Sequence, residues 1–314
     1  MPLVDMPLAE LQRYRGINPK PDNFDTFWTQ ALDELDTVPP DGRAEPAPFA
    51  TDFARCEHFY FRGVRGATIY AKKISPLERP KGAILMFHGY SMNSGDWADK
   101  LAYAAAGWTV YAMDVRGQGG RSEDSGGHAG TTLRGHIVRG LDGAPENMLY
   151  RQVFLDTVQL VRAAEVEGHD EIVVSGASQG GGLALACASL SPSVKRVVSW
   201  YPFLCDYRRV WEMDLARDAY DEMQEYFRRF DPLHEREEQT WNKLGYIDVA
   251  HLSERIEAEV LMFTGLMDTV CPPSTQFAAY NRVRGTKQMV LYPDFRHEGY
   301  PGSSDRAFQF LTKG

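Results

Sequence analysis

One serine of this 314-residue chain stands in a stretch whose residue types suit nucleophilic chemistry. Residues 171–175 are a mainly apolar run, residues 176–180 read Gly-Ala-Ser-Gln-Gly, and a run of small apolar residues follows. The order of strand, tight turn and helix predicts a nucleophile elbow, which holds the hydroxyl of Ser178 clear of the backbone. Gly176 and Gly180 flank the serine because a Cβ at either position would collide with the neighbouring segment. A glycine-rich loop with an inert serine is the alternative, which a base and an acid elsewhere would make untenable.

A base and an acid follow two later strand candidates. Asp268 comes after the apolar run 260–263, and His297 comes after the run 289–292. A serine hydroxyl is a weak nucleophile until a base removes its proton, and a histidine with the ordinary pKa of about 6.5 can do so at neutral pH. Asp268 would fix the imidazole tautomer and stabilise the imidazolium. Asp294 is the competing acid, but its place beside a proline favours a role in a turn.

Attack by such a serine creates an oxyanion, so the chain should also supply hydrogen-bond donors for that charge. The backbone N–H of Gln179 is the first, because it directly follows the nucleophile. The second should come from the loop after an earlier strand, and the N–H of Tyr90, just after the run 83–87, fits that description. His88 ends the same strand, where a structural hydrogen bond is favoured over a role as the base.

Arg116 follows a further strand candidate, residues 109–113, at the same edge of the sheet. A planar guanidinium can join several backbone and carboxylate acceptors at once. We therefore favour a buried ion pair that holds neighbouring loops over direct binding of a substrate.

The elements that position these residues alternate between strands and helices from Lys81 onward. The strand candidates are continuous apolar runs, as expected for parallel strands covered on both faces. They span residues 83–87, 109–113, 171–175, 196–200, 260–263 and 289–292, and helical patterns span 96–106, 147–166, 182–190 and 274–283. Residues 57–62 and 67–72 predict an antiparallel hairpin ahead of them. The expected fold is α/β, with a doubly wound, mostly parallel sheet, and the chain order Ser, Asp, His is that of the α/β-hydrolase fold.

We expect a single domain over residues 1–314 with three additions to the sheet. Residues 1–45 predict an N-terminal helical arm, residues 117–143 a loop excursion rich in Gly, Ser and Thr, and residues 205–252 a helical insertion rich in charged and aromatic side chains. Loops of that length are usually functional or contact a partner. The insertion could be a lid or a plain helical addition, and the sequence leaves both open.

Composition limits the classes of partner. The chain is 43% hydrophobic and 25% charged, and its net charge of −9 argues against nucleic acid or an anionic membrane as a partner. Four widely spaced cysteines show no Cys-x-x-Cys pair, so neither a zinc site nor a disulfide framework is expected. The first residues do not resemble a secretory signal, and no apolar run approaches membrane-spanning length. A cytoplasmic enzyme is therefore expected.

Three of these stretches together resemble the signature motifs of one family. Residues 116–118 (Arg-Gly-Gln), residues 176–180 and residues 297–298 (His-Glu) resemble those of the acetyl xylan esterase and cephalosporin C deacetylase family, carbohydrate esterase family 7. The likeness runs the whole length of the chain. The glutamine after the serine is its specific part, since Gly-x-Ser-x-Gly alone indicates only the superfamily. The resemblance implies supporting roles for Gln118 and Glu298 beside the triad.

The resemblance also implies an activity and an assembly. Family members remove acetyl groups from small acetylated sugars such as xylo-oligosaccharides and from cephalosporin C, make peracids from hydrogen peroxide, and need no metal or other cofactor. They form homo-hexamers, trimers of dimers, in which the 117–143 excursion would be the oligomer contact. The trio itself implies an acetyl-serine intermediate on Ser178. An esterase or peptidase of other acyl specificity on the same triad stays open, as does a catalytically inert binding protein.

Overall fold

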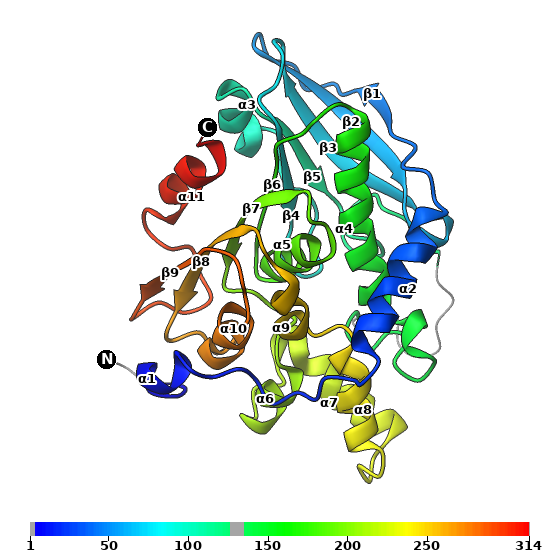
Figure 1. Ribbon diagram of the computed structural model, residues 1–314, viewed down its shortest axis with the longest axis vertical. Coiled ribbons are helices and arrows are strands. Elements are labelled where there is room, and N and C mark those ends of the chain that lie inside the picture. Colours follow the sequence, from blue (N-terminus) through cyan, green and yellow to red (C-terminus); the bar gives the residue numbers. More distant parts are fainter. Residues whose placement is uncertain (1–3, 126–134, 314) are drawn as a thin grey trace.

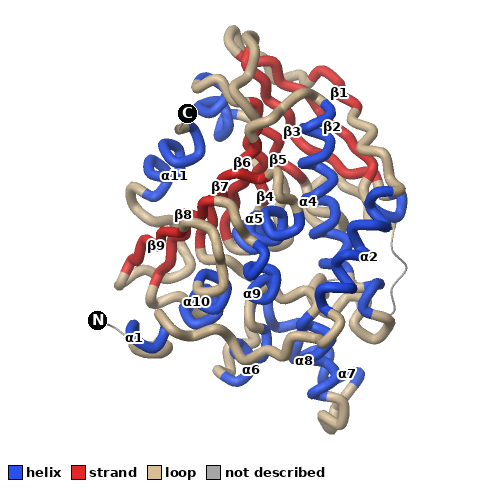
Figure 2. The backbone as a smooth tube through the Cα atoms, in the orientation of Figure 1, coloured by secondary structure: helices blue, strands red, loops and turns tan. Residues whose placement is uncertain are grey.

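The computed structural model describes residues 4–125 and 135–313, so residues 126–134 of the predicted excursion lie outside the described part. Its centre is one sheet in the strand order β1-β2-β3-β5-β4-β6-β7-β8-β9 (Figures 1 and 2). The strands are β1 Arg43–Pro46, β2 Ala54–Arg62, β3 Thr68–Pro76, β4 Ala83–Phe87, β5 Thr109–Met113, β6 Ile172–Ala177, β7 Val194–Trp200, β8 Glu259–Gly265 and β9 Lys287–Tyr292.

The helices fall between and around these strands, and short 3-10 turns join several of them. The helices are α1 Leu8–Leu11, α2 Phe24–Asp36, α3 Leu101–Ala105, α4 Leu149–Val166, α5 Gln179–Leu190, α6 Tyr207–Glu212, α7 Asp221–Phe230, α8 Glu237–Gly245, α9 Val249–Leu252, α10 Pro273–Tyr280 and α11 Ser303–Thr312. The 3-10 turns are η1 Val64–Gly66, η2 Ala98–Lys100, η3 Pro145–Asn147, η4 Asp218–Tyr220 and η5 Ser253–Arg255.

The six strands from β5 to β9 in the sheet order are parallel, whereas β1, β2 and β3 form an antiparallel extension that joins β5 through β3. The predicted fold class is confirmed: a mostly parallel sheet with an N-terminal antiparallel hairpin. From β4 the chain first adds β5 on one side and then β6 on the other. The carboxyl ends of β4 and β6 therefore meet where the strand order reverses, which is where ligands bind in open α/β sheets.

Helices cover both faces of the sheet. α2, α4 and α5 lie on one face, and α3 and α11 on the other (Figure 1). Adjacent residues of β4 show the consequence, because Leu85 belongs to the core under α4 and α5, and Ile84 to the core under α3 and α11. Both side chains are fully buried. A strand buried on both faces must be apolar at successive positions, which explains the continuous runs in the sequence.

Two elements were missed by the sequence patterns. β1 begins inside the predicted arm, at Arg43, and pairs with β2 as an edge strand with mostly exposed side chains. Such a strand has no apolar alternation to reveal it. The other is α11, which closes the second face near the C-terminus.

The N-terminal arm is fastened to the start of the helical insertion by one buried carboxylate. Asp206 accepts hydrogen bonds from the hydroxyl of Tyr14 (2.7 Å) and from the backbone N–H groups of Ile17 (3.0 Å) and Asn18 (2.9 Å). Its own N–H donates to the carboxylate of Asp248 at 3.0 and 3.1 Å. The stretch of the arm before α2 is thus bonded to the insertion.

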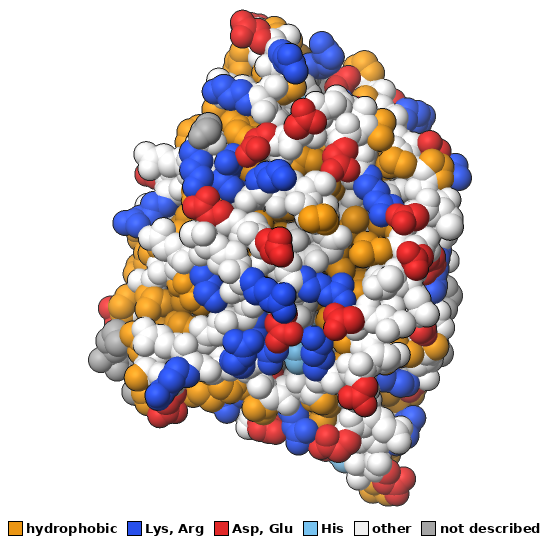
Figure 3. All heavy atoms as spheres, in the orientation of Figure 1, with side chains coloured by type: hydrophobic (Ala, Val, Ile, Leu, Met, Phe, Trp, Pro, Cys, Tyr) orange, Lys and Arg blue, Asp and Glu red, His pale blue; other side chains and the backbone are white. Residues whose placement is uncertain are grey.

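Basic and acidic side chains are interspersed on the face shown in Figure 3. Glu254 forms ion pairs with Lys20, Arg15 and Arg282. None of the helices within residues 4–125 and 135–313 has the length and hydropathy needed to cross a lipid bilayer.

Candidate active site

Ser178 lies between β6 and α5 in a backbone conformation that few residues adopt. Its φ is 56° and its ψ is −119°, and its N–H donates to the carbonyl of Trp200 (2.9 Å) while its carbonyl accepts from Phe203 (3.0 Å). A Cβ on Gly180 would lie 2.0 Å from the carbonyl oxygen of Phe87, and one on Gly176 would lie 2.4 Å from the backbone of Gly180. The steric argument made for these two glycines is confirmed. The chain is packed so closely that it has no room to relax the turn.

The structure brings together Ser178, His297 and Asp268. Oδ2 of Asp268 lies 2.8 Å from Nδ1 of His297, and Nε2 of His297 lies 3.0 Å from Oγ of Ser178. A carboxylate only accepts, so Nδ1 carries the proton and the lone pair of Nε2 is left to accept from the serine hydroxyl. The trio therefore has the orientation that base-assisted attack by the hydroxyl requires.

Asp268 is fully buried, and its charge is compensated by hydrogen bonds. Oδ1 accepts from the N–H groups of Val270 and Cys271, both at 2.8 Å, and Oδ2 accepts from His297. Asp294, the competing acid, is exposed in the turn after β9. The turn role favoured for Asp294 agrees with that place.

Gln179 is the first residue of α5, and Tyr90 lies in the loop after β4, the two places from which oxyanion donors are expected. The first N–H groups of a helix have no partner within the helix, so the N–H of Gln179 is available to a ligand. The buried side chain of Gln179 holds the two loops together, because its Nε2 approaches the carbonyl of His88 (3.3 Å) and donates to Gln118 (3.0 Å).

Arg116 forms the buried ion pair that the sequence favoured. Its guanidinium is 2% exposed and donates twice to the carboxylate of Asp156, with both distances 2.6 Å, and once to the carbonyl of Val64 at 3.1 Å. Burial raises the pKa of the Asp156 carboxyl, and the guanidinium opposes that shift. The pair ties the loop after β5 to α4 and to the turn between β2 and β3.

Two further predictions concern residues near the triad. His88 is structural: its Nε2 accepts from the N–H of Val115 (2.9 Å), and its Nδ1 donates to the carbonyl of Gly89 (2.7 Å). Glu298 is exposed and accepts from the N–H of Arg296 (3.0 Å), which shapes the turn that carries His297.

Comparison with known proteins now decides the family. A model described as acetyl xylan esterase (AXE1) matches residues 1–314. The chain belongs to the acetyl xylan esterase family.

Solved structures of this family are similar over nearly the whole chain. Acetyl xylan esterase 1 from Thermoanaerobacterium sp. JW/SL YS485 is 55% identical, with a TM-score of 0.95 and 98% of each chain covered. The acetyl xylan esterase from Paenibacillus sp. R4 is 34% identical, with a TM-score of 0.92 and 98% of this chain and 99% of that chain covered. Acetyl esterase Axe7A of Xylanibacter ruminicola is 26% identical over 294 residues, which are 88% of this chain but only 63% of that relative. The chain thus spans less than two thirds of that curated relative.

Two residues of the site were missed by the sequence analysis of this family member. Cys271 is fully buried, and burial raises the pKa of its thiol while a hydrogen bond with the Ser178 side chain opposes the shift. A neutral thiol therefore lies beside the nucleophile. Its place three residues after Asp268 was the available signal. The other is Glu222 on α7, whose carboxylate meets the hydroxyl of Tyr90 at 2.6 Å.

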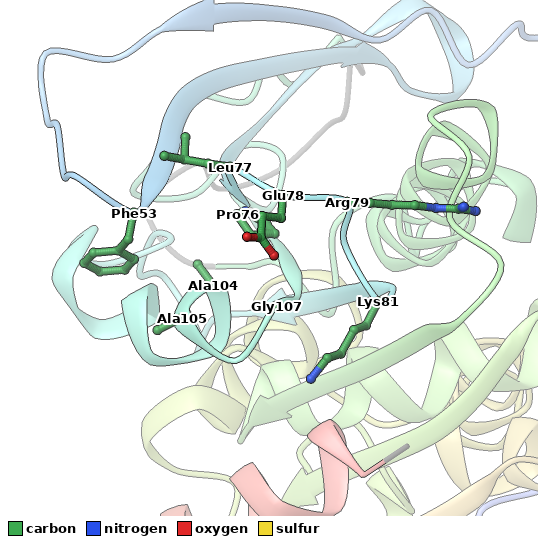
Figure 4. Close-up of a pocket in the computed structure, with 9 residues that line it drawn as sticks. All are labelled: Phe53, Pro76, Leu77, Glu78, Arg79, Lys81, Ala104, Ala105 and Gly107. Carbon is green, nitrogen blue, oxygen red and sulfur yellow. The ribbon is translucent and has the colours of Figure 1, made fainter.

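Two cavities differ in their relation to the triad. One of about 400 Å³, shown in Figure 4, is lined by Phe53, Leu77 and Lys81 among others and lies by the amino ends of β4 and β5, away from Ser178. Another, of about 370 Å³, is bordered by Gly89 of the loop after β4 and by Ala177 of the elbow.

The described part of the chain holds no cluster of three or more His, Cys, Asp or Glu side chains arranged to bind a metal ion.

Proposed function

We propose that this family member is a serine esterase that deacetylates small acetylated carbohydrates, xylo-oligosaccharides among them, and cephalosporin C through an acetyl-serine intermediate. The observation that carries the proposal is the continuous contact from Asp268 through His297 to Oγ of Ser178, at 2.8 and 3.0 Å. A binding protein would have no need to keep such an aligned proton path.

In the first half of the reaction, His297 accepts the hydroxyl proton as Oγ of Ser178 attacks the acetyl carbonyl carbon. The charge that develops on the carbonyl oxygen is stabilised by the backbone N–H groups of Gln179 and Tyr90, and such donors contribute about 3 kcal/mol each. His297 then gives the proton to the departing alcohol oxygen, which leaves an acetyl ester on Ser178.

In the second half, a water molecule gives a proton to His297 and attacks the acetyl-serine carbonyl. The tetrahedral intermediate formed by this attack then collapses, which returns the proton from His297 to Oγ of Ser178 and releases acetic acid. Hydrogen peroxide in place of water would release peracetic acid instead, and we propose this perhydrolysis as a side activity. Each step uses the same pair of oxyanion donors, because the same carbonyl oxygen carries the charge.

Family membership and the activities for which the relatives are named support the substrate class. Two similar solved structures, at 55% and 34% identity, are acetyl xylan esterases, and one curated relative is an acetyl esterase. We extend the family resemblance to a cytoplasmic homo-hexamer, a trimer of dimers, with neither nucleic acid nor membrane as a partner.

Hydrolysis of p-nitrophenyl acetate, butyrate and octanoate by the purified protein tests the acyl specificity, with acetylated xylo-oligosaccharides and cephalosporin C as the two candidate natural classes. Ser178→Ala, purified in parallel, controls for a contaminating esterase. A steep preference for acetate, with acetate released from the oligosaccharides, supports the proposal. Equal or faster turnover of octanoate would keep the serine hydrolase and overturn the deacetylase assignment. A protein that neither hydrolyses these esters nor reacts covalently with a serine-directed phosphonate would favour the binding protein.

A further inference from the structure

The helical insertion supplies a buried carboxylate to the loop that carries the second oxyanion donor. Glu222 lies in the first turn of α7 and is 2% exposed. Its Oε1 lies 2.6 Å from the hydroxyl of Tyr90, 132 residues earlier in the chain. Side chain and donor belong to one residue, so the position of the Tyr90 ring restricts the position of the Tyr90 N–H.

The other oxygen of Glu222 is also fully occupied. Oε2 accepts from the backbone N–H groups of Ile137 (2.8 Å) and Val138 (3.1 Å), which lie in the described part of the 117–143 excursion. Three donors from two separate segments therefore converge on one carboxyl group. Buried carboxyl groups are costly unless they are bonded in this way, so the arrangement defines one position for each segment.

The ring of Tyr90 is enclosed on two further sides. It packs edge-on against His136, with ring centroids 4.8 Å apart, and against Phe203, at 5.6 Å. The N–H of Phe203 donates to the carbonyl of Ser178 (3.0 Å). The Tyr90 ring is thus held between the insertion and a segment bonded directly to the nucleophile elbow.

We propose that Glu222 is a positioning residue for ester hydrolysis, which fixes the Tyr90 side chain and thereby holds the Tyr90 N–H at the distance that the developing oxyanion requires. This inference rests on the proposed function. It gives the 205–252 insertion a part in the chemistry that differs from that of a mobile lid, since α7 contributes a fixed contact to the site.

The contact persists in either protonation state of the carboxyl group. Burial raises the pKa of Glu222 to about 8, while the Tyr90 hydroxyl and the N–H groups of Ile137 and Val138 oppose the shift. As a carboxylate, Glu222 accepts from the Tyr90 hydroxyl. As an acid protonated on Oε1, it donates to that oxygen, and Oε2 still accepts from the backbone. The hydroxyl and Oε1 stay in contact both ways.

Three variants test the proposal on p-nitrophenyl acetate. Tyr90→Phe removes the hydroxyl and keeps the backbone N–H, and Glu222→Leu removes the carboxyl group. Glu222→Gln is the conservative variant, because its amide oxygen can accept from residues 137 and 138 while its N–H donates to the Tyr90 hydroxyl oxygen. Glu225→Ala is the matched control on α7, where Glu225 is partly exposed and forms an ion pair with Arg229.

A misplaced donor should lower kcat more than KM, since the oxyanion exists only in the transition state and the intermediate. We expect Tyr90→Phe and Glu222→Leu each to lower kcat about tenfold or more. The decrease should be smaller than the roughly hundredfold or greater decrease in kcat that follows removal of a whole oxyanion donor. Glu222→Gln should recover most of kcat, and Glu225→Ala should match the wild type. The double variant Tyr90→Phe/Glu222→Leu should be no worse than the poorer single variant.

A merely structural contact would give a different pattern, namely a lower melting temperature with an unchanged kcat per folded molecule. A kcat within about twofold of the wild type for folded Tyr90→Phe overturns the proposal, even if Glu222→Leu does not fold. A Glu222→Gln variant as poor as Glu222→Leu also overturns it. The proposed function fails separately, if the wild type does not hydrolyse the ester or if Ser178→Ala still does.

Discussion

The side-chain amides of Gln118 and Gln179 donate to each other in both directions. Nε2 of Gln118 lies 2.7 Å from Oε1 of Gln179, and Nε2 of Gln179 lies 3.0 Å from Oε1 of Gln118. Oε1 of Gln118 also accepts from the N–H of Ser91 (2.9 Å), and Oε1 of Gln179 from the hydroxyl of Tyr150 (2.7 Å). The loops after β4 and β5 and the first residue of α5 are therefore fixed to one another through two amides.

Gln118→Glu should lower kcat about tenfold at neutral pH. The new carboxylate can still accept from the Gln179 N–H, but it places an oxygen against the Gln179 oxygen, where the wild type has an N–H donor. One of the two hydrogen bonds is lost, and we expect the oxyanion donors to shift as a result. Steady-state kinetics with p-nitrophenyl acetate measure the effect. Gln288→Glu, at an exposed position of β9, is the control. An unchanged kcat for Gln118→Glu would show that the paired amides do not position the donors.

Arg116→Met should destabilise the protein by about 3–5 kcal/mol, because it leaves the Asp156 carboxylate buried without its partner. Urea unfolding measures the difference. Arg162 lies on the same helix as Asp156 and forms a partly exposed ion pair with Asp36 of α2. Arg162→Met removes that pair and should lower the stability by about 1 kcal/mol or less. The combination Arg116→Met/Asp156→Leu should regain part of the lost stability. Equal costs for the two single arginine variants would contradict the role assigned to Arg116.

Ser178→Gly should be more stable than Ser178→Ala by about 1 kcal/mol, although neither variant should turn over substrate. The φ of 56° and ψ of −119° are unfavourable for any residue with a Cβ, and glycine relieves that strain. Thermal unfolding compares the two variants. The same pair of substitutions at Ser189, in the last turn of α5, should give the opposite order, because a helical backbone conformation favours alanine over glycine. Alanine proving the more stable residue at position 178 would argue against strain in the elbow.

The fastening of the N-terminal arm should make stability depend on pH. Burial raises the pKa of Asp206 to about 6, and the charge of Asp248 adds to that shift. Burial also raises the pKa of Asp248 to about 7, although the N–H groups of Asp206 and Ala250 and the charge of Arg282 oppose that shift. In the unfolded chain both titrate near about 3.9. Between about pH 4 and pH 7 the folded state therefore binds more protons, so this pair lowers stability as the pH rises.

Asp248→Asn tests that sign, because it removes one of the two titrations and keeps an oxygen that can accept from the backbone. We expect the urea midpoint of the variant to fall less than that of the wild type between pH 5 and pH 7.5, and the two to converge at the acid end. Asp294→Asn, at an exposed turn, should keep the wild-type slope. A variant slope equal to that of the wild type would contradict the raised pKa of Asp248.

The fold was predictable because its central strands are buried on both faces. The triad was predictable because its three residues come after the carboxyl ends of parallel strands. Ser178, Asp268 and His297 each follow an apolar run within five residues, and parallel strands bring those ends to one edge. The edge strand β1 had no such signal, because its side chains face solvent.

The residues proposed to position the Tyr90 loop were harder to find, because their partners are set by how the insertion folds back. Glu222 contacts Tyr90 only after α7 folds against the loop that follows β4, and no sequence spacing encodes that contact. One signal was present: Glu222 lies four residues before Tyr226 on the apolar face of α7, with Met223 and Phe227, where an acidic residue needs a buried partner.

Mass spectrometry of acid-quenched enzyme tests the central claim most directly. Wild-type protein mixed with p-nitrophenyl acetate and quenched in acid during turnover should carry the mass of one acetyl group, and digestion should locate it on Ser178. Ser178→Ala should carry none and should not hydrolyse the ester. Turnover retained by Ser178→Ala, or an acetyl group that is located on another residue of the active wild type, would contradict the account.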